Sequence, residues 1–551
     1  MQMKMRLALT LAILNACACG NRESRLLDKV DVKGIAPLGG DLAYVQSSGV
    51  VQRLNVMDAN PQPKTSKISI TSSPRLIRKR PYVDLSNPID ELLVVSDGRS
   101  DQYGQVIEVP ALTVLTDKGD KREYKLVDPG QQMQVSKDGS YAILFNDPSY
   151  VDTTSLLTNP GEVAIVDLDP QSTRTENPDI HNLSTVGGPP FAVWFLELNI
   201  ATQGPRPFAL FGFPEGISLI DLSIPKDPGH KLDLTSWLPS GGMDKDSGFG
   251  VVFDKESAEI YLKNSHSSDI KVISVGPGAA DAEGGASNPV DISVRSLTVS
   301  NSTPPGAFDV YSLASGSRLL ATVGNAVTSV TTDSDTVTTV ALSLQANQIF
   351  QFDATSLPHD PTVRHRALLY QSDPTGGALQ TGVTFVDLED LETSKTQALQ
   401  TVDFGAKISS VLQLPTLPNQ TPLNKLLVFL SSGGIDVLDL ETRHWAPINS
   451  KVPITLMVAD STRNRLWVSA LDENRIGYVD LGISDISDLT INKSTQLDNP
   501  VQQMFQMNRA KISWVIVTHD QVGGAVTLVD ANNPERSTAH KLEGFLLSDL
   551  L

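Results

Sequence analysis

The apolar residues of this chain recur in short runs that are separated by clusters of turn-forming residues. The clearest example is residues Ile454–Leu481, with the sequence ITLMVADSTRNRLWVSALDENRIGYVDL. Its three apolar runs are Ile454–Ala459, Arg465–Ala470 and Ile476–Leu481, and polar turns lie between them. Runs of this length with short polar connections predict a small antiparallel meander of three strands.

The same unit recurs along most of the chain, and its third run often ends in an aspartate. Clear endings of this kind are Asp58, Asp167, Asp221, Asp387, Asp439, Asp480 and Asp530. Neighbouring endings lie 54 (167 to 221), 52 (387 to 439), 41 (439 to 480) and 50 (480 to 530) residues apart. A period of this size with four strands per unit is typical of β-propeller blades.

Second runs mark ten candidate units, and ten is the upper count because insertions disturb the period. They are Asp41–Val45, Glu91–Ser96, Tyr141–Phe145, Phe208–Phe211, Ala258–Leu262, Arg318–Val323, Ala367–Gln371, Lys425–Leu430, Arg465–Ala470 and Ser513–Thr518. The pattern predicts an all-β fold, a single closed β-propeller of four-stranded antiparallel blades. We expect seven to ten blades, with about eight favoured, over residues 31–551.

Three segments leave alternatives open. Gly276–Pro289 is an insertion rich in glycine and alanine. Val327–Leu342 is either a hairpin that protrudes from one blade or part of an extra blade. His540–Leu551 is either a short helix or a closing segment, in a ring whose two ends complete one sheet.

The repeated aspartates have a structural explanation. At the end of a strand, a carboxylate can accept hydrogen bonds from the amides of the following turn. We therefore interpret these residues as turn fixtures rather than as metal ligands or catalytic groups.

Composition supports a globular, turn-rich β protein. Of the 551 residues, 40% are hydrophobic and 19% are charged, with 39 glycines and 34 prolines. The formal net charge is −19. The only dense basic run is Arg75, Arg78, Lys79 and Arg80, which we interpret as a solvated strand edge, with contact to anionic lipid headgroups as the alternative. This charge distribution argues against a nucleic-acid partner.

The N-terminus has the features of a secretory signal. Lys4 and Arg6 precede the apolar run Leu7–Leu14, which is too short to span a bilayer, since that takes roughly 20 residues. The two cysteines, Cys17 and Cys19, both follow this run. The remainder of the chain therefore has neither a disulfide framework nor a cysteine metal site.

The segment Leu14-Asn15-Ala16-Cys17 resembles the bacterial lipobox. The resemblance implies a signal peptide over residues 1–16, and a lipid-modified Cys17 with a short tether over residues 17–30. Cys19 is the alternative attachment site. The following residue, Ala18 or Gly20, is not aspartate, which favours a lipid anchor in the outer membrane, on the periplasmic side or at the cell surface.

Units such as RLWVSALDENRIGYVDL and KLLVFLSSGGIDVLDLETR resemble the YVTN-type repeats of bacterial surface and periplasmic β-propellers, which are related to lactonase-like propellers. The resemblance implies the fold. Lactonase-like propellers hold their catalytic carboxylates, histidine and arginine in the central pore. No such set matches this sequence, so no catalytic residue is assigned.

Other chemistry has little support in the sequence. There is no His-Glu-x-x-His, Gly-x-Ser-x-Gly, phosphate-loop or dinucleotide motif. Calcium is the only cofactor with a candidate site, at Asp244 and Asp246 in Asp244–Gly248, where carboxylates alternate before a turn glycine. An ordinary turn beside a strand is the other interpretation.

Tryptophans suggest one partner-binding position. Trp467 and Trp514 lie inside second runs, so we expect them in the core. Trp445 follows a unit ending and is a candidate contact for a sugar or protein partner.

The leading hypothesis is an outer-membrane lipoprotein whose propeller is a non-enzymatic binding or scaffolding module for a protein or glycan. The alternative is a propeller enzyme, lactonase-like or otherwise hydrolytic, with a site in the central channel.

Overall fold

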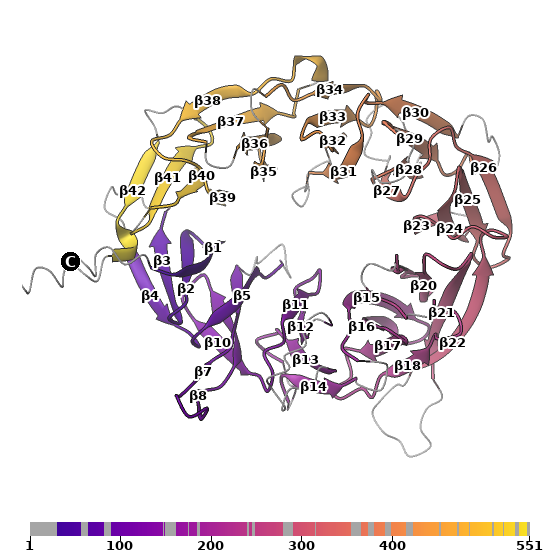
Figure 1. The fold of residues 1–551 in the computed structure, drawn as a ribbon, viewed down its shortest axis with the longest axis horizontal. Helices are drawn as coiled ribbons and strands as arrows, with labels where there is room; N and C mark the ends of the chain where they lie inside the picture. Colours follow the sequence, from indigo (N-terminus) through magenta and orange to yellow (C-terminus); the bar gives the residue numbers. More distant parts are fainter. Residues whose placement is uncertain are drawn as a thin grey trace, which may run out of the picture. The chain divides into compact units, whose positions relative to one another are not determined.

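The computed structural model is all-β, and its described part contains ten four-stranded antiparallel sheets and one two-stranded sheet (Figure 1). The structure describes residues 30–547 except 57–63, 82–89, 147, 149–160, 173, 175, 184–187, 240–241, 245–247, 279–289, 314–315, 354–364, 373–379, 392–397, 415–422, 451–452, 471–472, 484, 510–511, 522 and 535–538. The predicted β-propeller of four-stranded antiparallel blades is confirmed. Its ten blades equal the ten candidate units and exceed the favoured count of about eight.

The chain divides into two compact units. Unit 1 comprises Met1–Val127, Ser450–Asp480 and Thr490–Leu551, and so holds the first two and the last two blades. Its elements are β1 (Val32–Leu38), β2 (Asp41–Gln46), β3 (Val50–Asn55), β4 (Thr65–Ser69), β5 (Pro74–Lys79), β6 (Glu91–Ser96), β7 (Arg99–Ser100), β8 (Val106–Glu108), β9 (Ala111–Thr116), β10 (Lys121–Lys125), β35 (Leu456–Asp460), β36 (Arg465–Ser469), β37 (Arg475–Asp480), β38 (Asn492–Gln496), β39 (Gln503–Arg509), β40 (Ile512–His519), β41 (Ala525–Asp530), β42 (His540–Glu543) and the 3-10 helix η5 (Phe545–Leu547).

Unit 2 comprises Asp128–Asn449 and Leu481–Leu489 and holds the other six blades. Its elements are β11 (Gln132–Val135), β12 (Tyr141–Phe145), β13 (Glu162–Asp167), β14 (Asp179–Asn182), β15 (Ala192–Ile200), β16 (Gly204–Phe213), β17 (Gly216–Asp221), β18 (His230–Asp233), β19 (Gly250–Asp254), β20 (Glu259–Lys263), β21 (Asp269–Pro277), β22 (Val290–Thr298), β23 (Phe308–Leu313), β24 (Gly316–Val323), β25 (Ala326–Thr331), β26 (Val337–Ala341), β27 (Gln348–Asp353), β28 (His365–Tyr370), β29 (Gly382–Asp387), β30 (Leu399–Asp403), β31 (Ile408–Gln413), β32 (Lys425–Leu430), β33 (Ile435–Asp439), β34 (Trp445–Pro447) and the 3-10 helix η3 (Ile486–Asp488).

The ten second runs of the sequence form the second strand of ten successive blades. These strands are β2, β6, β12, β16, β20, β24, β28, β32, β36 and β40. The sequences of these strands are continuous apolar runs because both faces of each strand are covered. In β6, for example, all six residues are buried.

Two of the open segments adopt regular blade structure. Val327–Leu342 contains the third and fourth strands of one blade, β25 and β26, so it is neither a protruding hairpin nor an extra blade. His540–Leu551 provides β42, which completes the last sheet, and η5. The first and last sheets each consist of consecutive strands, and neither end contributes a strand to the other's sheet. Most of Gly276–Pro289 lies outside the described residues.

Four of the seven repeated aspartates act as turn fixtures, as the sequence predicted, whereas Asp58 lies outside the described residues. In four blades the Oδ1 atom of the strand-ending aspartate accepts a hydrogen bond from the amide two residues further on. The pairs are Asp167 with Asp169 (3.0 Å), Asp221 with Ser223 (2.8 Å), Asp439 with Glu441 (2.9 Å) and Asp530 with Asn532 (2.8 Å).

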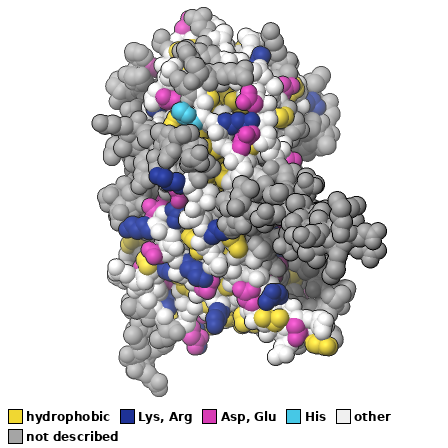
Figure 2. Space-filling model, turned by 90° about the vertical axis from the view of Figure 1, so that its left-hand side faces the viewer, with side chains coloured by type: hydrophobic (Ala, Val, Ile, Leu, Met, Phe, Trp, Pro, Cys, Tyr) yellow, Lys and Arg dark blue, Asp and Glu magenta, His cyan; other side chains and the backbone are white. Residues whose placement is uncertain are grey.

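Arg75, Arg78 and Lys79 lie on β5, an edge strand of its sheet, in agreement with the sequence interpretation. Arg80 follows the strand and is buried, so the interpretation as a solvated position is wrong for this residue. Arg75 pairs with Asp97 at 3.1 Å, and the buried Arg80 pairs with Glu91. Figure 2 shows acidic and basic side chains interspersed over the described surface of one face. Among the described residues, no helix has the length and apolar character needed to cross a membrane.

Candidate functional site

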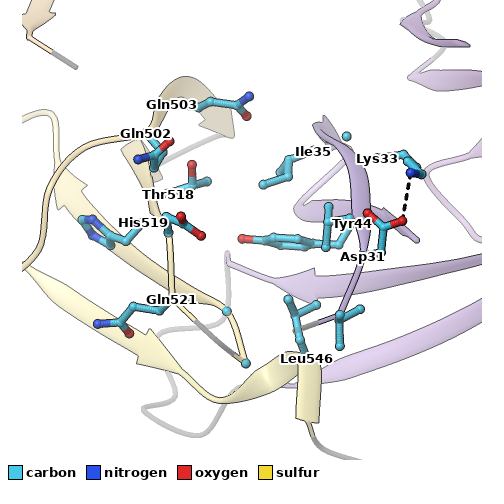
Figure 3. Close-up of a pocket in the computed structure, with 16 residues that line it drawn as sticks. Asp31, Lys33, Ile35, Tyr44, Gln502, Gln503, Thr518, His519, Gln521 and Leu546 are labelled. Carbon is cyan, nitrogen blue, oxygen red and sulfur yellow. Dashed lines mark ion pairs between the residues drawn. The ribbon is translucent and has the colours of Figure 1, made fainter. Parts of the chain in front are cut away.

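A pocket of about 560 Å³ lies in unit 1, where the first and last blades meet (Figure 3). One wall comes from β1 and β2, and the other from β39, the end of β40 and η5. The lining residues are Val30, Asp31, Val32, Lys33, Gly34, Ile35, Tyr44, Gln502, Gln503, Thr518, His519, Asp520, Gln521, Gly523, Gly524 and Leu546.

Main-chain hydrogen bonds hold the last-blade wall in place. The amide of Gln502 donates to the carbonyl of Thr518 at 2.9 Å. Gly524 adopts φ +82°, and a Cβ atom there would lie 2.7 Å from the Phe545 ring. Glycine therefore lets the turn before β41 approach η5 closely, and the amide of Leu546 donates to the carbonyl of Gly523 at 2.8 Å.

Tyr44 projects from the first blade into the base of this region. Its ring lies 5.0 Å from the ring of Phe545, centroid to centroid, and its residue is only 3% exposed. Among the described residues, its hydroxyl has no hydrogen-bond partner. Burial raises the pKa of Tyr44, so the phenol stays protonated. Figure 3 shows this hydroxyl directed across the pocket toward the end of β40.

Thr518 presents a second buried hydroxyl from the last blade. The residue is 2% exposed, and its Oγ1 atom likewise has no partner within the described part of the chain. The adjacent His519 is different, because Nδ1 lies 2.7 Å from the Pro500 carbonyl and Nε2 lies 2.8 Å from Oγ1 of Thr527. Burial lowers the pKa of His519. Both of its ring nitrogens are therefore engaged within the protein.

The exposed rim of the pocket carries three charged side chains, Asp31, Lys33 and Asp520, of which Asp31 and Lys33 pair with each other. Nζ of Lys33 lies 2.8 Å from Oδ2 of Asp31, and the hydrogen bond from Lys33 lowers the pKa of Asp31. The amide side chains of Gln502, Gln503 and Gln521 also line the pocket. Its polar groups are thus largely neutral donors and acceptors.

A second surface feature is the β7–β8 ribbon, which is inserted between β6 and β9 of the second blade. Figure 1 shows this ribbon standing away from the strands of its own blade. Tyr103 at its turn is 85% exposed, and Val106 and Ile107 on β8 are 58% and 56% exposed. Exposed apolar side chains that cluster on a protruding element are typical of protein contact surfaces.

The two predicted site residues that the structure describes, Asp244 and Trp445, are not among the residues that line the pocket. Cys17 and Cys19 lie outside the described residues, as does Asp246, while Asp244 is exposed. The described part of the chain contains no cluster of three or more histidine, cysteine, aspartate or glutamate residues suited to a metal. The calcium site stays a prediction.

The tryptophans singled out in the sequence differ in how far they are buried. Trp467 and Trp514 are buried in the core, as predicted. Trp445 in β34 is half-buried, and its ring lies 5.2 Å from the Phe404 ring. Its role in partner binding stays a prediction.

Sequence reasoning missed the pocket because its walls come from opposite ends of the chain. No motif joins Tyr44 to Thr518. The one available signal is a polar hydroxyl within an otherwise apolar second run, and such residues occur in several blades.

No family model matches this chain, and no curated protein matches its sequence. Among solved structures, dihydro-heme d1 dehydrogenase NirN in complex with DHE is 12% identical, with 94% of this chain and 76% of that chain covered and a TM-score of 0.33. Apo AztD from Citrobacter koseri is 13% identical over 76% of this chain and 87% of that chain, with a TM-score of 0.28. Scores of this size carry no argument about function, so the fold assignment rests on the sheets themselves.

Proposed function

We propose that this protein is an outer-membrane lipoprotein, anchored through Cys17 or alternatively Cys19, whose β-propeller is a non-enzymatic binding or scaffolding module for a protein or glycan partner. The lipobox-like N-terminus supports the anchor. The pocket between the first and last blades supports the binding role.

The observation that carries the proposal is the chemistry of the pocket lining. Hydroxyl and amide groups provide hydrogen bonds, while two buried ionisable groups, His519 and Tyr44, are unsuited to proton transfer. His519 has both ring nitrogens engaged, and the Tyr44 phenol stays protonated. General acid–base catalysis needs a group that can exchange a proton with the substrate near the working pH. The lining therefore favours binding over turnover.

The β7–β8 ribbon supports a protein as one partner. Its exposed residues Tyr103, Val106 and Ile107 form an apolar surface, and aromatic residues commonly anchor protein interfaces. A scaffold that contacts another envelope protein through this ribbon is compatible with a small-molecule pocket elsewhere in unit 1.

The anchor is tested by metabolic labelling with an alkyne fatty acid in intact bacteria. We expect label on the wild-type protein and its loss in Cys17→Ala. Labelling that persists in Cys17→Ala and disappears in Cys19→Ala selects the alternative attachment site. Absence of label in the wild type would overturn the anchor.

The scaffold role is tested by photo-crosslinking in the same cells. A photoreactive phenylalanine analogue in place of Tyr103 should yield a discrete crosslinked band. The matched control position is Val337 on β26, which is also exposed and apolar, and it should yield none. No band at Tyr103, or the same bands at both positions, would remove the protein-partner proposal.

A further inference from the structure

We infer that the pocket between the first and last blades binds a neutral, hydroxyl-rich sugar of about disaccharide size, with the hydroxyls of Tyr44 and Thr518 as its buried contacts. This inference deepens the proposed binding function and rests on it. It assigns a ligand class to one defined cavity of unit 1.

The size of the cavity suits a small molecule. Its volume of about 560 Å³ falls within the range of roughly 300–1,000 Å³ that is usual for ligand pockets. A flat protein epitope would not need a recess of this kind, so a compact ligand is the better fit.

The two buried hydroxyls point to a ligand that forms hydrogen bonds. Tyr44 and Thr518 are both more than nine-tenths buried, and neither hydroxyl has a partner among the residues described. Buried polar groups are normally paired, and an unpaired one is costly. Here two such groups come from the facing walls of one cavity, so a single ligand can satisfy both.

The remaining lining favours a neutral ligand over an anionic one. Asp31 and Lys33 neutralise each other at the rim, and three glutamine amides supply neutral donors and acceptors. Amides and hydroxyls can each match the donors and acceptors of a sugar hydroxyl. An anionic ligand would need an unpaired positive charge, but Lys33, the one lysine or arginine of the described lining, pairs with Asp31, and Asp520 adds a negative charge.

The apolar part of the lining completes the match. Val32, Ile35 and Leu546 lie beside the polar groups. A pyranose ring has a face of C–H groups and an edge of hydroxyls, so it can pack on such side chains while it donates and accepts hydrogen bonds. Because both protein hydroxyls are covered in this structure, side-chain rotation at the wall accompanies binding, as is common at binding sites.

The test uses full-length lipidated protein in lauryldimethylamine oxide, a detergent without a sugar headgroup. Isothermal titration calorimetry is performed with maltose, cellobiose, lactose and N,N′-diacetylchitobiose. We expect saturable binding of at least one of them. Tyr44→Phe and Thr518→Val should each weaken that binding about tenfold or more, because each removes one hydrogen bond between the protein and the sugar.

The variants should keep their stability, because neither hydroxyl loses a described protein partner. Thr384→Val is the matched control, since Thr384 in β29 also has a buried hydroxyl without a described partner and lies in unit 2, outside the pocket. Its sugar affinity should equal that of the wild type, and all three variants should melt at or above the wild-type temperature.

Three results would overturn the inference. They are no binding of any of the four sugars, unchanged affinity in both Tyr44→Phe and Thr518→Val, or equal loss in Thr384→Val. If these occur while the Tyr103 crosslink persists, only the sugar assignment fails. If the crosslink is also absent, the proposed binding function fails with it.

Discussion

The side-chain amide of Gln52 in β3 donates a hydrogen bond to the main-chain carbonyl of Phe545 in η5, and thereby joins the first blade to the C-terminal segment. Gln52 is fully buried, and its Oε1 atom accepts a hydrogen bond from Gln46 at 3.1 Å. One side chain thus satisfies polar groups from both ends of the chain.

Gln52→Ala should destabilise unit 1. The substitution leaves the Phe545 carbonyl and the Gln46 amide without this partner, and we expect a loss of about 2 kcal/mol in the free energy of unfolding. Urea denaturation followed by tryptophan fluorescence measures it. Gln345→Ala, at an exposed position, should stay within about 0.5 kcal/mol of wild type. Equal effects of the two substitutions would contradict the role of Gln52.

Gly524→Ala should disturb the wall of the pocket. The new methyl group would meet the Phe545 ring in a backbone conformation that disfavours side chains, so we expect a loss of about 2–3 kcal/mol. Gly433→Ala is the matched control, since its φ of +85° is similar and a Cβ there has open space. Thermal denaturation of the two variants separates the clash from the backbone cost, and similar melting temperatures would show that the close approach to η5 has no effect.

Glu91→Gln should weaken the second blade. The buried Glu91 carboxylate faces Arg80 and also accepts from Arg122, at 2.9 Å for Oε1 and 3.0 Å for Oε2. Neutralising it leaves a buried guanidinium without its counter-charge, which typically costs about 3 kcal/mol. Equilibrium denaturation measures the loss. Glu123→Gln, whose pair with Lys121 is exposed, should change stability by less than about 1 kcal/mol. An equally small change at Glu91 would show that the buried pair is dispensable.

Asp436 should make stability depend on pH. The residue is 2% exposed, its Oδ2 atom has no partner among the described residues, and burial raises its pKa to about 6 from the usual 3.8. The folded state therefore holds a proton that the unfolded state releases at lower pH. The contribution of Asp436 to stability is greatest below about pH 4, falls as the pH rises toward 6, and stays low above it.

Asp436→Asn removes this titration and keeps the shape of the side chain. We expect the variant to be about 1–3 kcal/mol more stable than wild type at pH 7, with the difference shrinking toward pH 4. Urea midpoints at pH 4, 5, 6 and 7 test the slope, with the exposed Asp333→Asn as the control. A difference that is the same at all four pH values would rule out ionisation of Asp436 as the cause.

The fold was predictable because each blade has a local signature. Apolar runs, turn residues and strand-ending aspartates such as Asp439 all lie within one unit, so the sequence pattern marked the second strand of every blade. Val327–Leu342 was ambiguous because its serine and threonine residues weaken the apolar pattern, although it forms the ordinary strands β25 and β26.

The pocket was not predictable by the same reasoning. Tyr44 and Thr518 meet only after the first and last blades pack together, and their distinctive property is a missing hydrogen bond, which no sequence pattern records. The β7–β8 ribbon was missed for another reason, because its strands are only two and three residues long and too short for a detectable alternation.

The packing of the first blade against the last has a consequence for biosynthesis. The apolar side chains of Leu42, Tyr44 and Leu54 are covered by residues of the last blade, including Ile516 and Phe545. Because a chain is made from its N-terminus, this face stays exposed to solvent until the final blade has been made. The nascent protein therefore exposes an apolar surface for nearly the whole of its synthesis. A product truncated before the last blade would keep this surface exposed, and it would be a substrate for chaperones and proteases.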